Sequence, residues 1–312
     1  MFARAFKSEA YRIFNMKSTF ILPAVLIVSV LITNFIYLAI NMEPLGFTRE
    51  RVDELQEMGT DVEGYQDSFM AGFQSGINSA NMMIEEEEEE IPEDYQIFGE
   101  GLYYYEDVAT IFSLDVGGLH ELLMMAIFIG LYIGSVYKTG MDKNLSIFAG
   151  RRGLLFGVRM LMIALYSLVI HLINLLTAIL SMAMMGESVR LGFDKAFYLY
   201  FLVTWILTIA FGCVVMSVTH ITRSKAAGMT LGILLSVGIL STIVSVVSLI
   251  LQKRYDLAMG FNLGNYTLTH NLSAMNLYSD GHFTVRALIC AAVYFCLAYI
   301  GSLIVVRRRD IA

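Results

Sequence analysis

The chain has 312 residues, of which 57% are hydrophobic and 16% charged, and its formal net charge is −7 at pH 7. Soluble domains carry about 25% charged residues, so this composition, with a mean hydropathy of +0.64, excludes an ordinary soluble domain and indicates a membrane protein. The three cysteines, Cys213, Cys290 and Cys296, all fall in apolar stretches and predict no disulfide framework.

Residues 1–18 precede the first apolar run and combine apolar with basic side chains. The apolar ones include Phe2, Phe6, Ile13 and Phe14, and the basic ones are Arg4, Lys7, Arg12 and Lys17. This mixture predicts an amphipathic helix that lies in the inner membrane interface with its cations among lipid headgroups.

Six apolar stretches are long enough to cross a bilayer, which takes about 20 residues because every backbone amide must be bonded inside the helix. They run over residues 19–40, 119–136, 154–182, 197–218, 226–250 and 283–306. The sequence therefore predicts an all-α membrane protein. Its parts are an interfacial helix (1–18), a first span (19–40), an outer domain (41–118), spans two to five (119–250, with a connector at 137–153), an outer segment (251–282), and a sixth span with a basic tail (283–312).

Orientation follows from lysine and arginine, which gather in the cytoplasmic flanks of membrane helices. With the N-terminus inside, the inner segments hold 14 of the chain's 21 basic residues, and the other seven are scattered. We therefore expect a multi-pass protein of the cell membrane with both termini in the cytoplasm.

Residues 41–118 would then lie outside, and they hold 20 of the chain's 28 acidic residues against two basic ones. Apolar and aromatic residues among them predict a small helical extracellular domain. Its run of six glutamates is either a collector for a cationic substrate such as an antimicrobial peptide or a solvated charge run, which is the commoner case. The run consists of Glu85, Glu86, Glu87, Glu88, Glu89 and Glu90. The second outer segment, 251–282, predicts short helices or a re-entrant hairpin.

Two ionisable residues of the spans are candidates for a membrane path. Glu121 opens the second span, where it either faces protein or is hydrated from outside. His171 lies inside the third span, as a proton or ligand site or as a hydrogen-bonded packing histidine. Because residue 124 is Met, the His-Glu-x-x-His spacing of zinc proteases is missing, and we expect no metal site.

Two pairs of glycines with four-residue spacing lie in the spans. They are Gly130 with Gly134 and Gly228 with Gly232. Such pairs permit close helix approach, and they either mark a dimer contact or arise by chance in glycine-rich spans.

The connector at 137–153 joins the second and third spans. Lys143 to Phe148 predict a short helix that ends at Gly150, and the pair Arg151-Arg152 follows. This segment resembles the intracellular loop of type 2 ABC exporter permeases, although Val136 and Met141 depart from the family pattern. The residues that fit it are Tyr137, Lys138, Gly140, Lys143, Asn144, Leu145, Arg152 and Arg159.

The resemblance implies the membrane subunit of an ATP-driven exporter for a peptide, lipid or drug-like substrate. In that family the connector docks on an ATPase subunit, which gives this role to Lys143, Asn144, Leu145, Phe148, Arg151 and Arg152. The implied partners are two ABC ATPase subunits, a second permease copy or a homologous permease, and membrane lipid, with no nucleic acid. The sequence lacks a Gly-x-x-x-x-Gly-Lys-Ser/Thr phosphate loop, so we expect no enzyme and no cofactor in this chain, with ATP and Mg held by the partner.

Two other classes compete with this interpretation. A secondary transporter or channel driven by an ion gradient would place ionisable residues deep in several spans, and His171 is the deeply placed one that the sequence offers. An intramembrane enzyme would bring His, Asp, Glu or Cys together at mid-depth with a metal-like spacing, which the spans do not display. A bacterial ABC permease is therefore the favoured hypothesis.

Overall fold

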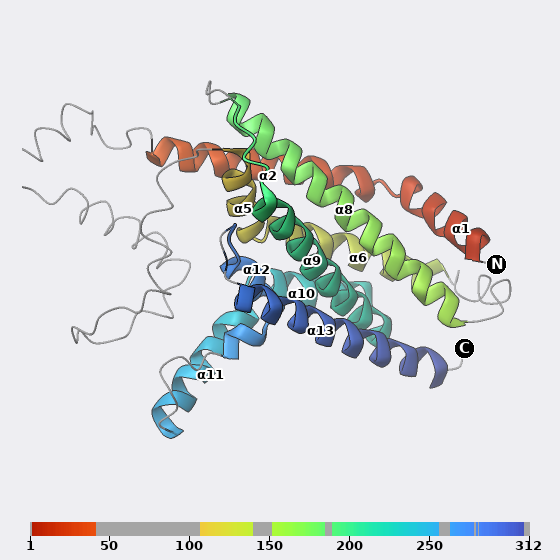
Figure 1. Cartoon of the computed structure of the whole chain (residues 1–312). Coiled ribbons are helices and arrows are strands. Elements are labelled where there is room, and N and C mark those ends of the chain that lie inside the picture. Colours follow the sequence, from red (N-terminus) through yellow and green to blue (C-terminus); the bar gives the residue numbers. More distant parts are fainter. Residues whose placement is uncertain are drawn as a thin grey trace, which may run out of the picture. The chain divides into compact units, whose positions relative to one another are not determined.

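The computed structural model describes residues 2–41, 107–139, 152–184, 189–255, 263–277, 279 and 281–308 (Figure 1). Within these ranges the chain is helical and contains no strand, which confirms the predicted all-α class. The helices are α1 (Phe2–Asn15), α2 (Ser18–Asn41), α5 (Val108–Gly117), α6 (His120–Thr139), α8 (Arg152–Met184), α9 (Lys195–Thr222), α10 (Lys225–Ser236), α11 (Ile239–Tyr255), α12 (Leu268–Ala274) and α13 (Gly281–Arg308), with a 3-10 helix at Leu263–Tyr266.

Five of the described helices are long and apolar enough to cross a membrane, namely α2, α6, α8, α9 and α13. They correspond to five of the six predicted spans. The predicted fifth span, residues 226–250, is interrupted, because α10 ends at Ser236 and α11 begins at Ile239. Gly238 between them has a φ of +79°, a left-handed conformation that glycine adopts without steric cost. One unbroken fifth helix was thus the wrong prediction for this segment.

Contacts between helices group the chain into two compact units. The first takes in Met1–Leu31, Asp107–Ser241 and Asn265–Ala312, and the second takes in Ile32–Glu106 and Thr242–Gly264. All clusters described below lie within the first unit.

Helices α6, α8 and α9 form the core of the first unit, and α6 runs antiparallel to α8. Glu121 at the start of α6 contacts His171, the rings of Phe128 and Tyr166 stack, and Tyr132 bonds the same glutamate as Arg159. This register places the beginning of α6 beside the middle of α8.

Helix α5 packs against α8 and buries Val108, Ile111, Phe112 and Val116. Asp107 begins this helix, because its carboxylate accepts a hydrogen bond from the backbone N–H of Thr110, as N-cap residues do. The sequence assigned residues up to 118 to the extracellular domain. Residues 108–117 of that segment form α5, which packs against α8 within the first unit.

Three of the four glycines, Gly130, Gly134 and Gly232, lie where α6 and α10 cross, and Gly228 faces Thr219 of α9. A Cβ atom at Gly134 would come within 2.5 Å of Cβ of Lys225, and one at Gly232 within 2.8 Å of Cβ of Ala126. A Cβ atom at Gly130 would likewise come within 3.1 Å of the backbone nitrogen of Met229. Glycine lets two helix backbones approach closely, and both pairs serve a contact within this chain.

Helix α1 buries one stripe, which consists of Ala5, Glu9 and Ile13 at four-residue spacing. Ala5 packs against Leu155 and Val158 of α8. Residues four apart share a helix face, so this stripe, with the half-buried Phe6 beside it, sets how α1 meets the core.

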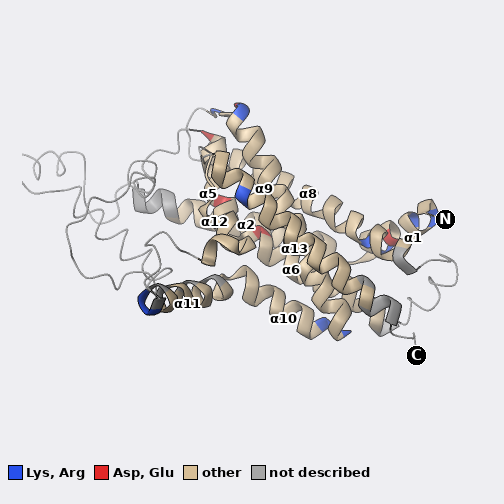
Figure 2. Ribbon diagram, turned by 60° about the horizontal axis from the view of Figure 1, so that its bottom comes forward, with Lys and Arg blue, Asp and Glu red and all other residues tan. Residues whose placement is uncertain are grey.

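Charged residues lie mostly at the ends of the helices, whose middles are largely uncharged (Figure 2). Glu9 in the middle of α1 and Glu121 at the start of α6 are both fully buried in the first unit. Buried carboxylates are costly unless they are paired and hydrogen-bonded, so their partners define the candidate sites.

Candidate functional site

Glu9 lies at the centre of a cluster that joins three helices. Its Oε1 accepts a hydrogen bond from Nε of Arg159 at 3.0 Å, and its Oε2 accepts one from the Tyr132 hydroxyl at 2.9 Å. Nη2 of Arg12 lies 3.0 Å from the same Oε2. We call these four side chains, from α1, α6 and α8, the Glu9 cluster. It combines one negative charge with two positive ones.

Arg12 turns toward α6, whereas the sequence analysis placed it among lipid headgroups. Its Nη2 donates to the backbone oxygen of Tyr132 at 3.3 Å, and its guanidinium lies 4.1 Å from the centre of the Tyr132 ring. A cation over an aromatic face is favourable, more so when water is excluded. The cluster therefore fastens α1 to the core through charge as well as packing.

The Glu9 cluster lies near both attachment points of the connector. Tyr132 is two turns before the end of α6 at Thr139, and Arg159 is two turns into α8. Tyr137, in the last turn of α6, contacts Nδ1 of His220 in α9 through its hydroxyl.

The predicted coupling residues lie at the edge of the described ranges or beyond them. Arg152 is the first residue of α8. The other five, Lys143, Asn144, Leu145, Phe148 and Arg151, lie outside the described residues, and so do the glutamates Glu85–Glu90.

Glu121 and His171, the two predicted membrane-path residues, contact each other. Nδ1 of His171 lies 2.6 Å from Oε2 of Glu121, and neither side chain is exposed. Nδ2 of Asn174 donates to Oε1 of Glu121 at 2.8 Å, and Nε2 of His171 lies 3.1 Å from the hydroxyl oxygen of Thr204. Of the two environments left open for Glu121, the structure shows protein.

This second cluster lies deep in the core and is lined by aromatic rings. His171 is thirteen residues, about 20 Å of helix, from the end of α8 at Met184. The rings of Phe112 and Phe201 flank the imidazole at centroid distances of 5.1 and 4.6 Å. The sequence placed Glu121 at the outer end of its span, but α5 continues the packing along α8 beyond it.

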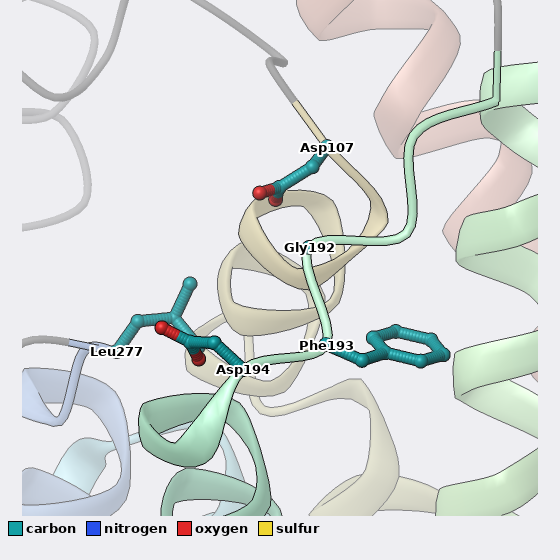
Figure 3. A pocket seen from close by; sticks show the side chains of 5 residues that line it. All are labelled: Asp107, Gly192, Phe193, Asp194 and Leu277. Carbon is teal, nitrogen blue, oxygen red and sulfur yellow. The ribbon is translucent and has the colours of Figure 1, made fainter.

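A cavity of about 350 Å³ opens between the starts of α5 and α9 (Figure 3). Asp107, Gly192, Phe193, Asp194 and Leu277 line it. Both carboxylates already cap helices, because Asp194 accepts from the backbone N–H of Phe197 just as Asp107 accepts from α5. Among the described residues, no group of three or more His, Cys, Asp or Glu is placed to hold a metal ion, so the cavity has no evident ligand set.

The described part of the second outer segment includes the 3-10 helix and α12, which lie between the end of α11 and the start of α13. It carries His270, whose pKa is lowered by burial and, less strongly, by the nearby cation of Arg286. This histidine is therefore neutral at pH 7 and adds no charge to this part of the first unit.

Sequence reasoning missed Glu9, and it missed Asn174 and Thr204, the polar partners of Glu121 and His171 respectively. Glu9 had a local signal, because it is an acidic residue in a basic helix and shares the stripe of Ala5 and Ile13. Asn174 also had one, since it lies one turn after His171 on the same face of α8. Thr204 had none, because many membrane helices carry a threonine that bonds its own backbone.

No family model, curated protein or solved structure matches the chain. The class of protein is therefore inferred from the fold and from the two buried clusters. Five long apolar helices, together with buried glutamates that pair with Arg159 and His171, indicate a multi-pass helical membrane protein.

Proposed function

We propose that the chain is the membrane-spanning permease subunit of an ATP-driven ABC exporter, and that a separate ATPase subunit docks on the connector at residues 143–152. The support from the sequence is the resemblance of the connector to that of type 2 ABC permeases. The support from the fold is the Glu9 cluster, which bonds both helices that flank the connector.

The Glu9 cluster suits a mechanical role. Arg159 and Glu9 are almost completely buried, with side-chain exposures of 4% and 0%, so their charges are held in place by each other. A displacement of the connector would reach α6 and α8 at once, and α1 would move with them because Glu9 bonds both. Coupling of distant sites by movement of rigid packed elements is the usual form of such transmission. ATP-driven closure of the partner would in this way reopen the helix bundle.

The first experiment tests whether the connector binds an ATPase subunit. The tagged chain is purified from its native membrane in mild detergent, and the preparation is searched for an ATPase subunit and for ATP hydrolysis. The Arg151→Glu, Arg152→Glu double variant should lose the subunit, since reversing partly buried interface charges costs about 2–5 kcal/mol. The single chain should hydrolyse no ATP.

The matched control is the Lys253→Glu, Arg254→Glu double variant. It makes the same charge change at an exposed basic pair at the end of α11, which the topology prediction places outside. It should keep the ATPase subunit. Absence of any ATPase from the wild-type preparation, or an equal loss in both variants, would refute the proposal.

A second candidate function is a transporter driven by an ion gradient, and the Glu121–His171 contact favours it. Acid–base pairs inside membrane proteins often mark proton relays. Transport into or out of vesicles that depends on a proton gradient and persists without ATP would establish this candidate and exclude the first one.

A further inference from the structure

The polar side chains around His171 determine how many protons the Glu121–His171 pair holds. The Thr204 hydroxyl has one hydrogen, and its best acceptor is the backbone oxygen of Tyr200 at 2.8 Å. The hydroxyl oxygen of Thr204 therefore accepts, and Nε2 of His171 carries the hydrogen that spans their 3.1 Å separation. One ring nitrogen is thus already protonated.

The other ring nitrogen then requires a second proton. Nδ1 of His171 lies 2.6 Å from Oε2 of Glu121, a separation that needs a hydrogen between the two atoms. With Nε2 already protonated, this hydrogen belongs either to an imidazolium beside a carboxylate or to a carboxylic acid beside a neutral imidazole. Both arrangements contain the same proton, and both make the pair neutral overall.

The surroundings of the pair favour this neutral state. Among the described residues, the ion-pair partner of Glu121 is His171. Tyr200 of α9 and His120 of α6 lie near Glu121, and the buried Asp115 of α5 lies near both of these side chains. Asp115 adds negative charge, and Phe112 and Phe201 exclude water from the imidazole. A bare carboxylate would therefore be buried without compensation, which costs several kcal/mol.

We propose that Glu121 and His171 form a buried proton-binding site, which holds one proton while α6, α8 and α9 are packed together. In neutral water a glutamate is a carboxylate and most histidine is uncharged, so separation of these helices releases the proton. This site does not depend on the proposed function, since its ligand is the proton and its residues lie away from the connector.

The test uses substitutions that change charge and keep shape. In Glu121→Gln the amide nitrogen can donate to Nδ1 while the amide oxygen accepts from Asn174, so the neutral state persists without the extra proton. In His171→Asn the new amide donates to Glu121 and leaves a buried carboxylate. The proposal predicts a near-normal melting temperature for the first variant and a lowered one for the second.

The double variant separates charge from packing. Glu121→Gln with His171→Asn has the same cavity as His171→Asn but no buried charge, so it should melt at a higher temperature than the His171→Asn single variant. If the single variant melts as high as the double one, His171 acts as a plain hydrogen-bond donor to a carboxylate, and the proposal is overturned.

Spectroscopy on the full chain detects the proton itself. Nitrogen-15 spectra of histidine-labelled protein, assigned through His171→Asn, should show an imidazolium, or infrared spectra should show a protonated carboxyl band that Glu121→Gln removes. A neutral imidazole without such a band would overturn the proposal.

Discussion

At the scale of single residues, the first unit depends on charges that are buried and compensated. Glu9 bonds two arginines and a tyrosine from three helices. Replacing a complete buried ion pair with apolar residues is often neutral, whereas removing one partner leaves a bare charge and costs about 3–5 kcal/mol. The effect of a substitution at Glu9 on stability therefore depends on whether its arginine partners keep their charge.

Glu9→Ala should strongly destabilise the protein, by about 3–5 kcal/mol, because Arg159 would remain buried without a counter-charge. Combining Glu9→Leu with Arg159→Met should restore most of that loss, since the deeply buried Arg159 charge is removed together with its partner and Arg12 keeps its contacts with Tyr132. Thermal unfolding in detergent measures both effects. Lys7→Ala on the exposed face of α1 is the control and should change little. Wild-type stability of Glu9→Ala would contradict the buried cluster.

At the scale of helices, small residues decide where backbones meet. Gly130 and Gly134 of α6 and Gly232 of α10 lie along the crossing of these two helices, where an added Cβ atom would clash with the opposite helix. Gly228 of α10 instead faces Thr219 of α9. The four-residue spacing identifies these glycines from the sequence, but it does not say which helix lies opposite. The structure answers that question, because the opposite face belongs to the same chain.

Gly134→Ala should lower stability by about 1–3 kcal/mol, the range for an overpacked contact. The new methyl group would lie 2.8 Å from Cα of Lys225, so the backbone of α10 has to move. Gly157→Ala in α8 is the matched control, because a Cβ there meets nothing within 4 Å; it should be neutral or slightly stabilising. Melting curves of the two variants decide this, and equal curves would rule out the close crossing.

At the scale of the whole molecule, the α10–α11 segment decides on which side the chain ends. Five crossings would leave the termini on opposite sides of the membrane, whereas a further crossing by α10 and α11 returns the C-terminus to the side of the N-terminus. The distribution of lysine and arginine favours the second arrangement.

Single cysteines in a cysteine-free background test this arrangement with an impermeant thiol reagent. Cysteines at Gly64 and Ser188 should react from outside intact cells, because the charge pattern places both positions there. Cysteines at Thr222 and Ala312 should react only after the membrane is opened. Labelling of Ala312→Cys in intact cells would mean an odd number of crossings and would overturn the predicted cytoplasmic C-terminus.

The sequence by itself determined the class of the protein and the positions of its long helices. An apolar run of about 20 residues can be recognised from the local sequence alone. Inside a bilayer each backbone amide must be bonded within its own helix, so such a run is sufficient evidence for a membrane-spanning helix. The same local pattern failed at residues 226–250, since a continuous apolar run does not reveal that Gly238 takes a positive φ.

Only the tertiary structure decided which polar groups meet. Glu9 and Arg159 are 150 residues apart, and Glu121 and His171 are 50 apart. Sequence reasoning selected Glu121 and His171 separately but did not pair them, and it did not select Glu9 at all. The pairing depends on the register and rotation of helices that are distant in sequence. These are set by the packing of whole helix faces, which include the glycines between α6 and α10, and not by the residues adjacent to each charge.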